Sequence, residues 1–104
     1  MIHLTAKNFE IETRHCDRPV FVMFYAVWCG KCAMMKSVVK TVEKRYQDRI
    51  KFCEVEIDES AVLAAEYEAD IVPTFVMFKD GEIESYMQGV LNEEVLEKRV
   101  RDLL

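Results

Sequence analysis

Residues 20–32 read Val-Phe-Val-Met-Phe-Tyr-Ala-Val-Trp-Cys-Gly-Lys-Cys. The first eight are apolar and rich in β-branched and aromatic side chains, which is typical of a central strand covered on both faces. The last five hold two cysteines separated by two residues. Residues 33–46 follow, with lysines and apolar side chains at helical spacing. The sequence therefore predicts that Cys29 and Cys32 lie where a strand gives way to a helix.

A cysteine at the start of a helix has a chemistry that a cysteine in a loop lacks. The free backbone N–H groups and the positive end of the helix dipole favour an anion there, and a thiolate is such an anion. Lys31 adds a positive charge near Cys29, whereas Cys32 lies further inside the helix and should be more buried and less acidic. We therefore expect Cys29 to attack a substrate disulfide and Cys32 to resolve the mixed disulfide.

Two alternatives would use the same cysteine pair. The pair could be half of a zinc site, but structural zinc usually has four ligands, commonly in two closely spaced pairs. The other cysteines and the histidines are scattered along the chain (Cys16, Cys53, His3 and His15). A cysteine hydrolase would need a histidine beside Cys29, and nothing in the sequence predicts one there. The spacing therefore favours a redox pair, with no metal site.

The chain has 104 residues, of which 51% are hydrophobic and 32% charged, a balance that is typical of a globular domain. We expect a single domain over residues 1–104. No apolar run approaches the ~20 residues that span a bilayer, and residues 1–7 lack the basic and then apolar build of a signal peptide. We therefore expect a cytoplasmic protein without a membrane segment.

Charge is unevenly distributed along the chain. Residues 1–53 hold 10 lysines and arginines against 5 acidic residues, a net charge of +5, and residues 54–104 hold 4 against 14, a net charge of −10. This acidity, and the lack of a surface that combines aromatic and basic residues, disfavour nucleic-acid binding. We prefer the interpretation that the two halves attract each other within one domain. The alternative is a basic face that docks acidic partners.

Hydrophobic periodicity, turn residues and capping residues predict nine elements in the order βαβαβαββα. Strands are expected at residues 2–4, 20–27, 50–57, 75–78 and 83–88, and helices at residues 5–15, 29–46, 60–67 and 93–103. Asp80-Gly81 is a hairpin signal, so the last two strands should be antiparallel. The fold class is therefore α/β, with a central mixed β-sheet flanked by helices on both faces.

Capping residues and apolar stripes define three of these helices more closely. Thr5 and Asn92 are the predicted N-caps of the first and the last helix. The side chains expected to be buried are Met35, Val38, Val39, Val42 and Tyr46 in the long helix and Val95, Leu96, Val100 and Leu103 in the last. The opposite, solvent-facing side of the long helix is expected to hold Lys36, Lys40 and Lys44.

The sequence resembles the thioredoxin family over nearly its whole length. The resemblance rests on residues 28–32 (Trp-Cys-Gly-Lys-Cys), 71–74 (Ile-Val-Pro-Thr), 78–82 (Phe-Lys-Asp-Gly-Glu) and Gly89. It implies the thioredoxin fold and an enzyme that reduces protein disulfides through a redox-active disulfide between Cys29 and Cys32. It also implies a monomer with no bound cofactor, reduced by a thioredoxin reductase, a flavin enzyme that uses NADPH.

The resemblance also implies a substrate-binding surface around the cysteine pair. Pro73 matches the family's cis-proline, which lies against the active-site cysteines, and the backbone of Val72 offers hydrogen bonds to an extended substrate. The substrate-binding residues implied in this way are Trp28, Gly30, Lys31, Val72, Pro73, Thr74 and Gly89. Two alternatives to a general reductase stay open, a non-catalytic binding or scaffold protein with this fold and a specialised glutaredoxin-like reductase.

The chain departs from the family pattern behind the cysteine pair. Lys31 stands where thioredoxins usually have proline. Met23 stands where the family has a buried aspartate that accepts a proton, and Glu54 stands where it has a neighbouring lysine. Glu54 could supply the displaced carboxylate as a proton acceptor if burial beside Cys32 raised its pKa. In the alternative, Glu54 points to solvent or pairs with a lysine.

Overall fold

The computed structural model describes residues 1–104 and contains five strands and four helices. The strands are β1 (Ile2–Leu4), β2 (Val20–Tyr25), β3 (Lys51–Glu56), β4 (Thr74–Lys79) and β5 (Glu82–Gln88), and the helices are α1 (Phe9–Thr13), α2 (Gly30–Tyr46), α3 (Ala61–Glu66) and α4 (Glu93–Arg101). Their order confirms the predicted βαβαβαββα pattern. None of the helices combines the length and the apolar composition that crossing a membrane requires.

The five strands form one mixed sheet in the order β1-β3-β2-β4-β5. β3 pairs in parallel with β1 and β2, and β4 pairs antiparallel with β2 and β5. The predicted hairpin between β4 and β5 is confirmed, with positive φ angles of 53° at Asp80 and 79° at Gly81. A Cβ atom on Gly81 would lie 2.9 Å from the carbonyl oxygen of Arg14, so this turn has room only for glycine.

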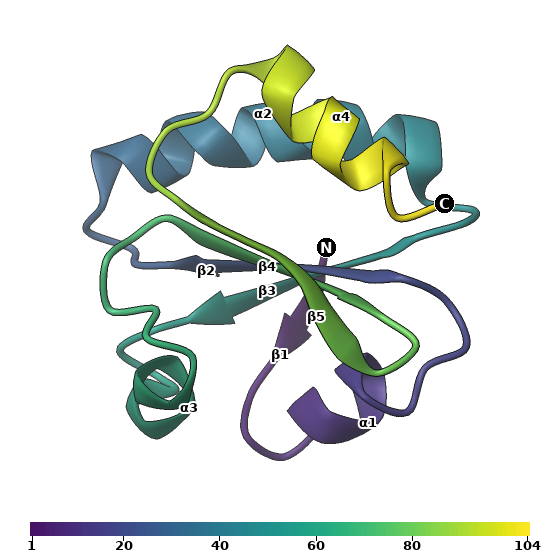
Figure 1. Ribbon diagram of the computed structural model, residues 1–104. Coiled ribbons are helices and arrows are strands. Elements are labelled where there is room, and N and C mark those ends of the chain that lie inside the picture. The colour runs from purple at the N-terminus through teal and green to yellow at the C-terminus, as the bar shows by residue number, and fades with distance from the viewer.

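Helices cover both faces of the sheet, α2 and α4 on one face and α1 and α3 on the other (Figure 1). Alternate side chains of β2 enter the two cores. Those facing α2 and α4 are Phe21, Met23 and Tyr25, and those facing α1 and α3 are Val20, Val22 and Phe24. Every residue of β2 is therefore buried, which explains why this strand reads as a continuous apolar run.

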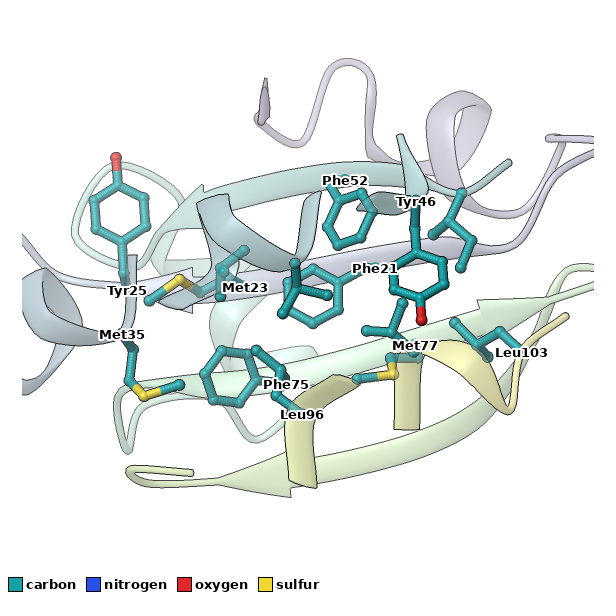
Figure 2. Packing of buried hydrophobic residues seen from close by; sticks show 14 of the residues in the cluster. Phe21, Met23, Tyr25, Met35, Tyr46, Phe52, Phe75, Met77, Leu96 and Leu103 are labelled. Carbon is teal, nitrogen blue, oxygen red and sulfur yellow. The ribbon is translucent and has the colours of Figure 1, made fainter. Parts of the chain in front are cut away.

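The core between the sheet and the two helices α2 and α4 is built from aromatic rings and methionines (Figure 2). The ring centroid of Phe21 lies 5.1 Å from that of Phe52 and 5.7 Å from that of Phe75. Met23 on β2 and Met35 on α2 are fully buried in the same core. This packing fixes the start of α2 against the end of β2, which is where Cys29 and Cys32 lie.

The first helix is shorter than predicted. It begins at Phe9 and not at Thr5, because the side chains of Thr5 and Asn8 bond to nearby backbone N–H groups. Thr5 Oγ1 accepts from the N–H of Lys7 at 3.3 Å, and Asn8 Oδ1 accepts from the N–H of Thr5 at 2.8 Å. Such local bonds stabilise a turn in competition with the helix. The predicted N-cap at Thr5 was therefore wrong, whereas Asn92 does cap α4, by accepting from the backbone at 2.9 Å.

Three valines are more exposed than the sequence predicted. β2 ends at Tyr25, two residues early, and Val27 beyond it is 81% exposed. Val95 is 44% exposed because α4 turns its neighbour Leu96 toward the core instead. Val38 is half-buried at the margin of the stripe on α2. The bounds of the remaining helices and strands agree with the prediction to within two residues.

Candidate active site

Cys29 is the N-cap residue of α2, with an extended backbone at φ −95° and ψ 110°. Its sulfur accepts a hydrogen bond from the backbone N–H of Cys32 at 3.2 Å. One of the N–H groups that a helix leaves without a partner at its start is therefore directed at this sulfur. The predicted position of Cys29 at a helix N-terminus is confirmed.

Cys32 lies under the first turn of α2 and is only 1% exposed. Burial and a hydrogen bond to Cys29 raise the pKa of Cys32 to about 11, although a backbone hydrogen bond at Ala26 and the charge of Lys36 act in the opposite direction. This confirms the prediction that Cys32 is a buried and weakly acidic thiol. Both cysteines are free thiols in this structure.

The segment around Pro73 lies against Cys29. The peptide bond between Val72 and Pro73 is cis, and the thiol of Cys29 lies 3.9 Å from the carbonyl oxygen of Val72. The N–H of Gly89 donates to the carbonyl of Pro73 at 2.8 Å, and Thr74 is fully buried as the first residue of β4. The fold thus brings together four residues that are far from Cys29 in the sequence.

Exposed apolar side chains lie next to the cysteines in the sequence. Trp28 is 66% exposed, and its indole N–H donates to Asp58 Oδ2 at 2.8 Å. Val27 is still more exposed, as is Ile71 near Pro73, at 60%. Sequence analysis missed both, because Val27 continues the apolar run of β2 and Ile71 appeared only as part of a break before β4. Among the predicted binding residues, Lys31 is exposed and Gly30 faces open space.

A hollow of about 240 Å³ lies behind the cysteine pair. It is lined by Tyr25, Ala26, Val27, Cys29, Cys32, Ala33 and Lys36. Lys36 was predicted to lie on the solvent-facing side of α2. This was wrong, because only 29% of its side chain is exposed and it lines the hollow instead. The usable signal was its position four residues after Cys32, because residues four apart lie on the same face of a helix.

Three side chains form a polar cluster at the edge of this hollow, Lys36, Tyr25 and Glu54. The Nζ atom of Lys36 lies 3.4 Å from the centroid of the Tyr25 ring and 3.6 Å from Glu54 Oε1. The Tyr25 hydroxyl donates to Glu54 Oε2 at 3.2 Å. Burial and the nearby charge of Glu54 raise the pKa of Tyr25 to about 12, so the phenol keeps the proton that it donates. We call these three residues the Lys36 cluster.

Glu54 is held by partners and does not have the raised pKa that a proton acceptor near neutral pH would need. Burial raises its pKa, but the hydrogen bond from His3, the charge of Lys36 and the hydrogen bond from Tyr25 outweigh burial and leave the pKa lowered. The structure therefore shows the alternative in which Glu54 pairs with a lysine. Its role as proton acceptor stays a prediction that this pairing does not support.

His3 on β1 joins Glu54 to Glu59. Its Nδ1 lies 2.9 Å from Glu54 Oε2 and its Nε2 lies 2.6 Å from Glu59 Oε1. Hydrogen bonds to Glu54 and Glu59 raise the pKa of His3 above its ordinary value. A raised pKa in the folded state stabilises the fold below the ordinary pKa of about 6.5, and that stabilisation disappears as the pH rises through the raised value.

The replacement His3→Gln should therefore cost the most stability near pH 5.5 and progressively less above neutrality. The loss should stay below about 1 kcal/mol, since 44% of the His3 side chain is exposed and solvent screens the pair. Urea unfolding at several pH values measures this difference in the free energy of unfolding. His15→Gln is the matched control, because His15 is exposed and has no carboxylate partner. Equal pH dependence in both variants would contradict the prediction.

The structure contains no group of three or more His, Cys, Asp or Glu side chains that could hold a metal ion. Cys53 is fully buried on the α1 and α3 side of the sheet, and burial raises its pKa to about 12. A thiol buried in this way is a core side chain with little reactivity. Cys16 is half-buried and packs against the same core.

Two cysteines separated by two residues at the start of a helix, the first accepting a backbone N–H and the second buried, have the arrangement of a thiol–disulfide oxidoreductase. Comparison with known proteins agrees, since the family model described as Thioredoxin matches residues 1–102. The chain therefore belongs to the thioredoxin family, has the thioredoxin fold and is a thiol–disulfide oxidoreductase. The resemblance seen in the sequence is confirmed.

Individual relatives match over most of this chain. A thioredoxin of Pseudomonas aeruginosa is 34% identical over 96 residues, which cover 92% of this chain and 89% of that protein. A thioredoxin of Porphyra purpurea is 35% identical over 94 residues, 90% of this chain and 88% of the relative. A chloroplastic M-type thioredoxin of Triticum aestivum is 37% identical over 90 residues, 86% of this chain and 51% of the relative.

The proteins of this family share a general reaction and a general electron donor. Thioredoxins act on disulfide substrates and are reduced by a thioredoxin reductase. They need no bound cofactor, because the cysteine pair is itself the redox centre.

Proposed function

We propose that this protein reduces disulfides in other proteins, with Cys29 as the nucleophile and Cys32 as the resolving thiol. The observation that carries this assignment is the asymmetry of the pair. The sulfur of Cys29 accepts a backbone N–H from the helix start, whereas Cys32 is buried and holds its proton to a high pH. The first thiol is therefore the one that can meet a substrate, and the second acts within the protein.

The reaction proceeds in two exchanges. The thiolate of Cys29 attacks one sulfur of the substrate disulfide, which forms a mixed disulfide and releases one substrate thiolate. Cys32 then loses its proton and attacks Cys29, which forms the Cys29–Cys32 disulfide and releases the second substrate thiolate. The two released thiolates take protons from solvent. The substrate gains two electrons and the cysteine pair loses two.

The substrate would lie across Cys29 as an extended chain. The backbone of Val72, which comes within 3.9 Å of the Cys29 sulfur, would form hydrogen bonds with it, and the exposed ring of Trp28 would give apolar contact. Gly30 has open space where a side chain would stand, so a substrate can approach there. Lys31 would contribute charge, whereas Thr74 and Gly89 would act by holding the turn at Pro73.

The electrons would come from a flavin-containing thioredoxin reductase that uses NADPH, and the protein would act as a monomeric electron carrier in the cytoplasm. A reducing compartment suits a chain in which only one pair of cysteines, Cys29 and Cys32, is closely spaced. General protein-disulfide reduction is favoured over a glutaredoxin-like role because the family match extends over residues 1–102, including the first strand and helix.

The proposal is tested by equilibrating the protein with glutathione buffers of increasing oxidation. We expect one disulfide, between Cys29 and Cys32, that forms at a potential more reducing than that of glutathione. Mass spectrometry of fragments that separate Cys16 from Cys29 identifies the bond, and after denaturation Cys16 and Cys53 should still be alkylated as free thiols. A strongly oxidising couple would contradict a reductase. Failure of the pair to link, or metal bound to it, would favour a scaffold or metal-binding protein.

A further inference from the structure

The resolving thiol needs help to ionise, and the hollow that it lines is also lined by a positively charged side chain, Lys36. Cys32 is buried, and a buried thiol resists loss of its proton because the low-dielectric interior disfavours the anion. In the second exchange of the proposed function, however, Cys32 must attack as a thiolate. Apart from the two cysteines, the hollow is lined by only two ionisable side chains, Tyr25 and Lys36.

Lys36 is held in one place by the other two members of the Lys36 cluster. Its ammonium rests on the face of the Tyr25 ring, 3.4 Å from the centroid, which is a favourable cation–π contact. Glu54 Oε1 lies 3.6 Å from the same nitrogen. The Tyr25 hydroxyl donates to the other oxygen of Glu54 and so ties the two anchors together. The ammonium therefore has a defined position, unlike that of an unpaired surface lysine.

The position of this ammonium is suited to act on Cys32. Lys36 follows Cys32 by four residues on α2, so the two side chains lie on the same face of the helix, and both line the hollow. Met23, on the neighbouring strand, is fully buried and apolar and offers no charge or proton acceptor. Glu54 has both oxygens engaged, by Lys36 on one side and by His3 and Tyr25 on the other.

We propose that Lys36 is a positioning residue for the second exchange, and that its ammonium stabilises the Cys32 thiolate while Tyr25 and Glu54 hold that ammonium beside the hollow. This inference rests on the proposed role of Cys32. In the step itself, Cys32 passes its proton to water and its sulfur bonds to the Cys29 sulfur. The bond between Cys29 and the substrate breaks, and the departing substrate thiolate takes a proton from solvent. Lys36 keeps its protons throughout.

The titratable groups around Cys32 come from four elements. Helix α2 supplies Cys29 and Lys36, β2 supplies Tyr25, and β3 supplies Glu54, which His3 contacts from β1. In the mixed disulfide Cys29 has no charge and no proton, so its effect on Cys32 falls away. Tyr25 is neutral over the working range of pH. Lys36 is therefore the charged side chain that lines the hollow together with the resolving thiol. Its removal should change the ionisation of Cys32.

The test uses the full chain with Cys29→Ser, which removes the thiolate of Cys29 and mimics its uncharged state in the mixed disulfide. Carbon-13 NMR of the Cys32 Cβ follows this one thiol as the pH is changed, without interference from Cys16 or Cys53. Adding Lys36→Met, which keeps most of the length of the side chain and removes its charge, should lower the fraction of Cys32 thiolate about tenfold at a pH well below the pKa of Cys32. Lys36→Arg should restore most of it.

Lys40→Met is the matched control, since Lys40 is exposed one turn further along α2 and should leave the titration of Cys32 unchanged. An unchanged titration in Lys36→Met, or an equal shift in Lys40→Met, would overturn the inference. A thermal melt shows whether each variant is folded, and Lys36→Arg decides between charge and packing. This measurement needs no turnover, so a negative result would contradict the role of Lys36 and not the proposed reductase function. A failure of the glutathione titration would contradict the reductase function and is a separate result.

Discussion

Replacing Cys29 by serine is expected to abolish catalysed disulfide reduction, whereas replacing Cys32 should stop the reaction halfway. Serine at position 29 cannot form a disulfide, so the rate of insulin reduction should fall to background, by at least about a hundredfold. With Cys32→Ser the first exchange still occurs, because Cys29 keeps its place at the start of α2. Its mixed disulfide then persists, since no second thiol is present to break it.

The measurement combines an insulin-reduction assay with mass spectrometry of the protein after exposure to a disulfide substrate. Cys32→Ser should carry one covalently bound substrate chain at Cys29, and Cys29→Ser should carry none. Cys16→Ser is the matched control, because Cys16 packs on the opposite side of the sheet and should be dispensable. If Cys29→Ser reduced insulin as fast as the unaltered protein, or if adducts formed at Cys32, the assigned roles would be reversed or wrong.

Most of the fold could be predicted because local patterns decide it. The apolar, β-branched and aromatic run that starts at residue 20 is typical of a strand covered on both faces, and Asp80-Gly81 is typical of a tight hairpin. The errors arose where a local pattern meets a competing interaction. The side chains of Thr5 and Asn8 form a turn, which shortens α1. Val27 continues the apolar run in the sequence, although β2 ends at Tyr25 and Val27 is exposed.

Only part of the active site could be predicted from the sequence. The spacing of Cys29 and Cys32 and the position of Pro73 are motifs, and motifs can be recognised without coordinates. The Lys36 cluster is no motif, because its members come from α2, β2 and β3 and meet through the register of the sheet. Glu54 lies opposite His3 on one side and opposite Met23 on the other. Only that register shows that Glu54 is occupied by partners. Only the fold shows that Lys36 and Cys32 line the same hollow.

The register also explains why the aspartate of the family pattern would be costly at Met23 in this chain. Met23 is fully buried in the core beneath α2 (Figure 2), and its paired neighbour on β3 is Glu54. An aspartate there would place a second carboxylate next to the first, in an apolar surrounding. We expect Met23→Asp to lower the free energy of unfolding at pH 8 by about 3–5 kcal/mol.

The pH dependence separates charge from lost packing in this variant. Burial and the carboxylate of Glu54 should hold the pKa of an aspartate at position 23 well above its unfolded value of about 3.9. The cost should therefore be smaller near pH 4, where the folded-state aspartate is protonated and the unfolded one is about half protonated, and should grow as the pH rises toward the folded-state pKa.

Urea unfolding from pH 4 to pH 8 measures this cost, and if the variant is unfolded at pH 8, refolding on acidification reports the same quantity. Met23→Asn is the control for polarity and should show a loss that does not change with pH relative to the unaltered protein. Met23→Leu, which keeps the apolar volume, should cost less than about 1.5 kcal/mol. Equal losses in the Asp and Asn variants at pH 8 would mean that the Lys36 ammonium, or water in the hollow, compensates the new charge. Position 23 would then tolerate a carboxylate, and the pairing of Glu54 would not be what excludes one.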